Sequence, residues 1–257
     1  MKRFNLRWQL PFTLTLLAFF VFVPMLSALE FSLKTSIKSQ HSFENYLWAF
    51  RQPEFAHYIF RSGWLSALTV AISLLLLVPL IAWLHITDSK VRPAIDALSL
   101  MPLIIPVVAF AIGAQVSMPM FVQDTVFEIP FLYAMIALPY TYRSLDIGMS
   151  AFPIKVLTEA ARSSGANWLS TIRFVVGPVI RSSILAATAL CFALSLGEFT
   201  LTSLLHWDTF PTWINDISQG NVIGAIALSM LSLVIPFLAL AAFSIFMPEK
   251  NTTRRVD

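Results

Sequence analysis

Residues Trp64–Leu84 read WLSALTVAISLLLLVPLIAWL, a run of 21 residues that contains no charged side chain. An α-helix rises 1.5 Å per residue, so a run of this length can cross the ~30 Å hydrocarbon core of a bilayer. The whole chain has a similar character: 57% of its 257 residues are hydrophobic, 12% are charged, and the mean hydropathy is +0.75. This composition excludes an ordinary water-soluble domain and predicts an all-α, polytopic membrane protein.

Working outward from this run, the apolar pattern predicts six transmembrane helices in a single domain that covers residues 1–257. Their expected ranges are 11–29, 64–84, 98–117, 127–142, 183–205 and 222–247. The fourth is short and has Glu128 at its edge, so we expect it to borrow residues from Phe121 onward or to lie where the membrane is thin. Between the first two spans, the spacing of Phe43, Tyr46, Leu47 and Phe50 predicts a short amphipathic helix.

The distribution of Lys and Arg predicts the orientation of the chain in the membrane. Cationic loops are translocated poorly, so they remain on the cytoplasmic side. Thirteen of the 17 Lys and Arg residues fall in segments on one side of the predicted spans. They are Lys2, Arg3, Arg7, Lys90, Arg92, Arg143, Lys155, Arg162, Arg173, Arg181, Lys250, Arg254 and Arg255. Both termini are therefore expected in the cytoplasm, with the first apolar run retained as an uncleaved span.

The sequence has few residues of the kinds that serve as catalytic groups or metal ligands. Cys191 is the single cysteine, and the four histidines lie outside the apolar runs without an HExxH-like spacing. A zinc hydrolase is disfavoured, and we expect neither a metal site nor a catalytic residue. The net charge of +3 is small, and its distribution indicates membrane topology rather than a nucleic-acid partner.

The segment 143–181 carries the strongest local motif. It contains Glu159-Ala160-Ala161, then three residues, Gly165, nine further residues and Val175-Val176-Gly177-Pro178. This pattern resembles the cytoplasmic loop of permease subunits of binding-protein-dependent ABC importers, which reads Glu-Ala-Ala, three residues, Gly, nine residues, Ile-x-Leu-Pro. Val175 and Gly177 depart from it. The resemblance extends from about Phe43 to Met247 and is to the subgroup that serves polyamines, ferric iron, thiamine or phosphonates.

The same loop residues have a physical interpretation of their own. Good helix formers from Ile154 to Ser164, followed by Gly165, predict a short helix, a turn and a second short helix. Ile154, Leu157 and Ala161, with Ala160 at its edge, would form one apolar face. In the cytoplasm this face has no lipid to cover it, so it either docks on a partner protein or packs on the loops of this subunit.

The resemblance implies a transport subunit without enzymatic activity of its own. It implies coupling to a separate ATPase through the loop residues Leu157, Glu159, Ala160, Ala161, Gly165 and Pro178. Because the chain has no GxxxxGK[ST] loop, ATP is expected on the partner subunit, and no cofactor is expected here. The implied partners are ABC ATPase subunits, a second permease, identical or different, an extracytoplasmic substrate-binding protein and membrane lipid, with no nucleic acid. The implied location is the bacterial cytoplasmic (inner) membrane.

Polar residues recur along the fifth predicted span. Thr188, Cys191, Ser195, Glu198 and Thr202 are spaced by three or four residues, which places them on one face of a helix. Thr188, Ser195, Glu198 and Thr202 are therefore candidates for lining the translocation pathway, and the acid would suit a cation. The alternative is helix packing with structural hydrogen bonds. For the whole chain, an ion-coupled secondary carrier and an intramembrane enzyme are the alternative functions.

Overall fold

The computed structural model describes residues 6–34, 41–123, 125 and 127–245. The chain divides into two compact units, one of Met1–Ala56 with Trp213–Val234 and one of His57–Thr212 with Ile235–Asp257. Within the described residues the secondary structure is helical, apart from one isolated bridge between Lys34 and His41. The predicted all-α class is confirmed. Several residues used above lie outside the described ranges: Lys2, Arg3, Lys250, Arg254, Arg255 and the end of the sixth span at 246–247.

The first unit contains α1 (Leu6–Ser32) and α2 (Glu44–Arg51). They agree with the first predicted span and with the amphipathic helix expected around Phe43 to Phe50. Hydrogen bonds hold α2 against the end of α1: the hydroxyls of Ser32 and Tyr46 lie 2.6 Å apart, and Asn45 Nδ2 donates to the Ser32 carbonyl at 2.9 Å. The start of α2 is therefore fixed to the end of the long apolar helix.

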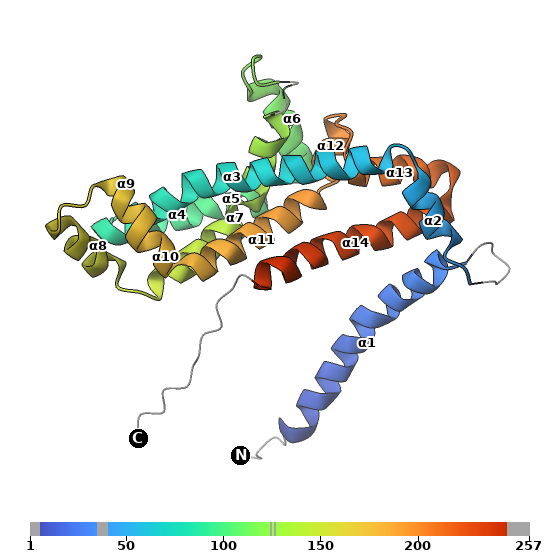
Figure 1. The fold of residues 1–257 in the computed structure, drawn as a ribbon, viewed down its shortest axis with the longest axis horizontal. Helices are drawn as coiled ribbons and strands as arrows, with labels where there is room; N and C mark the ends of the chain where they lie inside the picture. The colour runs from blue at the N-terminus through green and yellow to red at the C-terminus, as the bar shows by residue number, and fades with distance from the viewer. Residues whose placement is uncertain (1–5, 35–40, 124, 126, 246–257) are drawn as a thin grey trace. The chain divides into compact units, whose positions relative to one another are not determined.

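The second unit is built mainly from α3 (Phe55–Thr87), α7 (Glu128–Ser150) and α11 (Arg181–Leu196) (Figure 1). Shorter helices lie between them or follow α11. These are α4 (Arg92–Ser99), α5 (Met101–Ile104), α6 (Val107–Ser117), α8 (Ile154–Ser163), α9 (Trp168–Thr171), a π-helical turn η1 (Ile172–Val176), α10 (Gly177–Val179) and α12 (Thr200–Leu204). α13 (Phe210–Gly220) and α14 (Val222–Ile245) each have residues in both units. α13 has no counterpart among the predicted helices.

The core of the second unit lies where α3, α7 and α11 meet. Ile81, Leu145 and Ala187, one from each helix, are fully buried in the same cluster. α7 and α11 lie in close contact at Gly148, where an added Cβ would come within 2.3 Å of Ser183 Cβ. Only glycine allows this approach, because any side chain would occupy the space of Ser183.

Three helical segments in the described part of the chain are long and apolar enough to cross a membrane. They are Pro11–Ser32, Phe55–Thr87 and Arg181–Leu204. Arg92–Ile104 and Val107–Ser117 add a fourth if this bent pair forms one span. These helices support a polytopic membrane protein. The total of six spans stays a prediction, since α7 is not among the candidates and Val222–Leu238 of α14 counts only as a shorter apolar helix.

The third predicted span is bent in the structure. Its two halves are bent by 105° at a break before α6. Ile105 has φ −81° and ψ 123°, an extended conformation directly before Pro106. The proline ring disfavours helical geometry in the preceding residue, so the helix ends there.

The fourth and fifth predicted spans also differ from the structure. α7 begins at Glu128 and extends to Ser150, so it gains residues at its C-terminal end rather than from Phe121 onward. Leu145 and Met149 are fully buried in the core cluster and account for the extension. The fifth segment is interrupted, because α11 ends at Leu196 and α12 begins at Thr200. Arg181–Leu204 as a whole is nevertheless among the segments that are long and apolar enough to cross a membrane.

Candidate functional site: the α8 loop and the polar stripe

The loop motif forms a helix with a glycine-dependent end. α8 is followed by Gly165 with φ +86°, a conformation that L-residues with side chains adopt at a cost. The Gly165 N–H donates to the Arg162 carbonyl at 2.9 Å, and the Ala166 N–H donates to the Ala161 carbonyl at 3.1 Å. This is the Schellman arrangement, which satisfies the last carbonyls of a helix. Asn167 then caps α9, accepting from the Ser170 N–H at 2.8 Å.

The apolar face predicted for α8 packs on this chain itself. Ile154 is 2% exposed and belongs to the same core cluster as Val176 and Ile180, while Leu157 and Ala161 are half-buried. Ile154 thus packs on this chain, while Leu157 and Ala161 keep part of their surface exposed, so docking of this face on a partner stays a prediction. The exposed side of α8 instead presents Lys155, Val156, Glu159, Ala160 and Arg162. This mixed polar and apolar surface is what remains available for a partner.

The end of the loop explains one departure from the permease pattern. The Gly177 N–H donates to the Ile172 carbonyl across the π-helical turn, and a Cβ at residue 177 would lie 3.1 Å from that oxygen. A leucine here would press against the backbone of η1, whereas glycine fits. Pro178 follows in the first turn of α10, where its missing N–H costs nothing, and it is exposed.

An ion pair joins α8 to the turn between α3 and α4. Lys155 Nζ lies 2.5 Å from Asp88 Oδ2. The hydrogen bond from Lys155, with its charge, lowers the pKa of the Asp88 carboxyl below its usual value, and the same contact raises the pKa of Lys155. Both side chains are exposed, so the pair orients the loop more than it stabilises the fold.

The polar stripe of the fifth segment is mostly buried inside the second unit. Cys191 Sγ lies 3.6 Å from Ser73 Oγ of α3, and Ser195 Oγ donates to the Cys191 carbonyl at 2.8 Å. Thr202 is fully buried and Thr188 is half-buried. The structure thus brings Ser195, Cys191 and Thr202 into packed positions with hydrogen bonds. Their role in lining a pathway stays a hypothesis.

Glu198 occupies the break between α11 and α12. Its Oε1 accepts from the Leu201 N–H at 2.8 Å, so the side chain caps the start of α12. Its backbone carbonyl accepts from the Tyr133 hydroxyl at 3.3 Å. The side chain is half-buried, so its carboxylate is not sealed within the packed interior. Glu198 therefore stabilises the start of α12, and its lining of a pathway stays a hypothesis.

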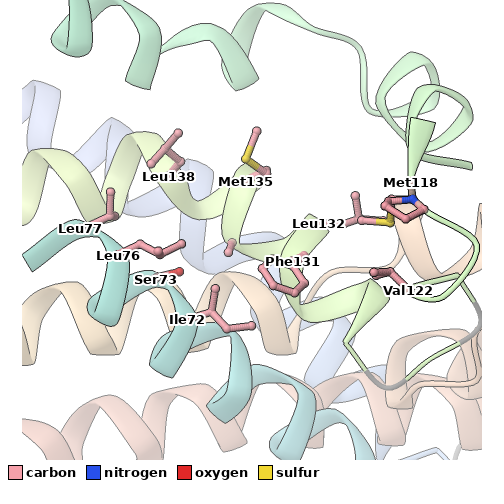
Figure 2. A pocket seen from close by; sticks show the side chains of 12 residues that line it. Ile72, Ser73, Leu76, Leu77, Met118, Val122, Phe131, Leu132, Met135 and Leu138 are labelled. Carbon is pink, nitrogen blue, oxygen red and sulfur yellow. The ribbon is translucent and has the colours of Figure 1, made fainter. Parts of the chain in front are cut away.

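An apolar cavity of about 400 Å³ lies between α3 and α7 (Figure 2). Its walls come from the middle of α3, from α7 and from the turn after α6. The residues include Ile72, Leu76, Met118, Phe131, Met135 and Leu138. Ser73 is the polar side chain on this wall, and it is already in contact with Cys191. The lining suits hydrocarbon rather than a charged solute.

Two buried acids of the second unit, Asp146 and Glu128, have partners that were not predicted from the sequence. Asp146 is 5% exposed and contacts His85 and Arg92, residues from α3 and α4. Glu128 is 4% exposed and its Oε2 accepts from Trp207 Nε1 at 3.1 Å. An acid within an apolar helix is a detectable signal, but the identity of its partner is not visible in sequence. In the described part of the chain, His, Cys, Asp and Glu residues form no group that could hold a metal ion.

Comparison with known proteins points to transport. Over 158 residues the chain is 28% identical to a protein of Haloferax volcanii named as a molybdenum ABC transporter permease, covering 56% of this chain and 58% of that protein. This chain is similar to ABC transporter permeases. It is also 24% identical, over 145 residues and 54% of each chain, to proteins of Salmonella typhimurium and Salmonella choleraesuis named as the 2-aminoethylphosphonate transport system permease PhnV.

The similarity is limited in extent. The matched region spans little more than half the length of the curated relatives. No family model matches the chain. The relatives are nevertheless named as transport permeases, and this chain has apolar helices long enough to cross a membrane.

Proposed function

We propose that this chain is the membrane-spanning permease subunit of a binding-protein-dependent ABC importer. The observation that carries the proposal is the α8 loop: the Glu159-Ala160-Ala161 motif forms a helix, and Gly165 closes it with a positive φ. The similarity to permeases and the apolar helices of membrane-spanning length support the same assignment. In this function the subunit opens alternately to each side of the membrane and performs no covalent chemistry on the solute.

The exposed side of α8 is the proposed contact with a separate ATPase. Lys155, Glu159 and Arg162 offer charges there, while Val156 and Ala160 offer apolar surface that has no lipid to cover it in the cytoplasm. The opposite side of α8 is held in the core by Ile154. A force applied to the exposed side would therefore reach the ends of α3 and α7 directly, as a rigid-body movement.

The proposed assembly contains a second permease, two ATPase subunits and an extracytoplasmic binding protein. Six spans or fewer are too few to enclose a path alone, so a second permease, identical or different, is needed. We place the assembly in the bacterial cytoplasmic membrane with both termini inside, on the basis of the Lys and Arg distribution.

The proposed cargo is a small solute, with a phosphonate as the first to test. The relatives are named for molybdenum and for 2-aminoethylphosphonate. The phosphonate is among the substrates expected from the loop resemblance, alongside polyamines, thiamine and ferric iron. The case for a cation rested on Glu198, and this case is weaker because its carboxylate already accepts a backbone hydrogen bond.

Reconstitution tests the function directly. The tagged chain is purified from membranes of its host with its associated proteins, which are identified by mass spectrometry and placed in proteoliposomes. We expect an ABC ATPase to co-purify, and solute uptake to require ATP inside the vesicle and binding protein outside. Uptake driven by a sodium or proton gradient without ATP would instead establish the secondary carrier. Turnover of a membrane-embedded substrate without transport would establish an enzyme.

A further inference from the structure

A buried carboxylate joins three helices at the end of the second unit that carries α8. Asp146 of α7 is 5% exposed. Its Oδ1 lies 2.9 Å from His85 Nε2 at the end of α3 and 2.8 Å from an Arg92 guanidinium nitrogen at the start of α4. Its Oδ2 faces Arg143 of the same helix at 3.8 Å. A carboxylate this well buried is tolerated only where such partners surround it, so it fixes the three helix ends relative to one another.

A second polar contact also joins α4 to α7. The Tyr142 hydroxyl donates to Asp96 Oδ1, one turn along each helix from the Arg92–Asp146 pair. Arg92 and Asp96 are four residues apart on α4, and Tyr142 and Asp146 are four apart on α7, so each pair lies on one face. Arg92 also donates to Ser150 Oγ at 3.3 Å. The short α4 is thus held to α7 along its polar face.

The α8 loop is attached to the same group of helix ends. Ile154 lies in the core cluster that contains Tyr142 and Leu145, and Lys155 pairs with Asp88 in the turn between α3 and α4. Figure 1 shows α4 and α8 at the same end of this unit. The first turn of α8 is therefore attached to the core at the end of α7 and to the turn between α3 and α4.

The second half of the bent segment, α6, lies beside part of the polar stripe. α4 and α5 form the first half of the segment bent by 105° before α6, and α6 packs against α12. Ala111 of α6 and Leu201 of α12 share a buried cluster. Leu201 is also the residue whose N–H is capped by Glu198. A continuous set of contacts thus runs from α8 through the bent segment to the break beside Glu198.

We propose that Asp146 is a positioning residue that ties the first half of the bent segment to the α8 loop, so that α8, α4 and the end of α7 move as one body during transport. This inference rests on the proposed importer function. Loss of the contact between Asp146 and Arg92 should uncouple ATP hydrolysis from transport, because α8 could then move without moving α4. The test measures the coupling between ATP hydrolysis and transport directly.

The test uses the purified complex of this chain with its co-purifying ATPase in proteoliposomes. The variants are Asp146→Asn and Arg92→Gln, the second of which leaves His85 and Arg143 beside Asp146. Lys90→Gln is the matched control, since it removes an exposed cation from the same turn. The readout is solute transported per ATP hydrolysed, per assembled complex. We expect this ratio to fall about fivefold or more in Arg92→Gln, with ATP hydrolysis retained, while Arg92→Lys and Lys90→Gln keep the normal ratio.

A ratio that stays normal in Arg92→Gln and Asp146→Asn overturns the proposal and leaves Asp146 a purely structural residue. If both variants fail to assemble, a second measurement tests the proposal in a chain that keeps Asp146 and Arg92. Spin labels at Lys90→Cys and Ser163→Cys, with Cys191→Ser, report the distance from the α4 turn to α8. We expect the same distance distribution with and without ATP, and a change on ATP binding overturns the proposal. A wild-type chain that shows no ATP-driven uptake would refute the importer function itself, before any variant is compared.

Discussion

The ammonium of Lys155 lies 2.5 Å from the Asp88 carboxylate, although 67 residues of chain separate them. The contact predicts a pH dependence for the position of α8. The pKa of Asp88 is lowered from its usual value of 3.8 by this hydrogen bond. The stabilisation that the ionised carboxylate contributes is therefore present above pH 3.8 and is lost as the pH falls through the lower pKa of the folded protein. The pKa of Lys155 is raised, so its contribution is present below 10.5 and is lost as the pH rises through the higher value in the folded protein.

We therefore expect a nitroxide at Arg162→Cys, in a Cys191→Ser background, to be less mobile at neutral pH than at pH values well below 3.8. Electron paramagnetic resonance of the detergent-solubilised chain measures this mobility. Because the pair is exposed, high salt should produce part of the same change at neutral pH. Lys155→Gln is the control, and it should already be mobile at neutral pH. Equal mobility in the control and the parent chain would show that the pair does not hold α8.

The close approach of α7 and α11 predicts a severe effect of Gly148→Ala. The new Cβ would lie 2.0 Å from Ser183 Oγ, so the helices must separate. We expect the free energy of unfolding to fall by about 1–3 kcal/mol, the usual cost of overpacking. Thermal unfolding followed by fluorescence-detected gel filtration measures it. Gly113→Ala is the matched control, since an added Cβ there meets nothing within 4 Å. Adding Ser183→Gly should restore part of the stability, and a double variant as unstable as Gly148→Ala would contradict the assigned clash.

The turn after α8 predicts that the choice of residue at position 165 matters through backbone conformation alone. Gly165 has φ +86° and open space around it, so a side chain meets no neighbour. We expect Gly165→Val to cost roughly 1–2 kcal/mol locally and to weaken co-purification of the ATPase, whereas Gly165→Asn should be tolerated because asparagine adopts positive φ more readily. Uptake and ATPase recovery per inserted chain are the measurements. Normal assembly and uptake in the valine variant would remove the coupling role of this turn.

The cap at Glu198 predicts different outcomes for two substitutions. Glu198→Gln keeps an oxygen that can accept from the Leu201 N–H, so we expect normal stability and nearly normal uptake. Glu198→Leu removes the cap and should cost about 1 kcal/mol, with less assembled complex. Uptake per assembled complex separates the two interpretations. A glutamine variant that assembles normally and fails to transport would show that the charge itself faces the solute.

The predicted orientation can be tested with single cysteines in a Cys191→Ser background. We expect Asp208→Cys to react with a membrane-impermeant thiol reagent applied from outside the cell. Ser164→Cys, beside the turn after α8, should react only after the membrane is opened. Both positions are exposed, so differences in labelling report the side of the membrane. Labelling of Ser164→Cys from outside would reverse the topology and remove the α8 loop from the compartment that contains the ATPase.

The local features of this protein follow from short stretches of its sequence. The apolar run at 64–84 lies within α3, the spacing from Phe43 to Phe50 produces α2, and Gly165 ends α8 as predicted. The breaks were partly foreseeable as well. Pro106 marks the bend of the third segment through a rule that concerns only neighbouring residues. Gly197, in contrast, gave no comparable signal for the interruption before α12.

The sequence by itself determined that this is an all-α membrane protein with a permease-like loop, because hydrophobicity, helix caps and backbone preferences act between residues close in the chain. Only the tertiary structure decided which face of α8 is covered and which residues surround Asp146. Those outcomes depend on contacts such as His85 with Asp146, 61 residues apart, and Arg92 with Asp146, 54 residues apart. A buried carboxylate must find cations wherever the packed helices bring them, and no local pattern specifies which cations these are.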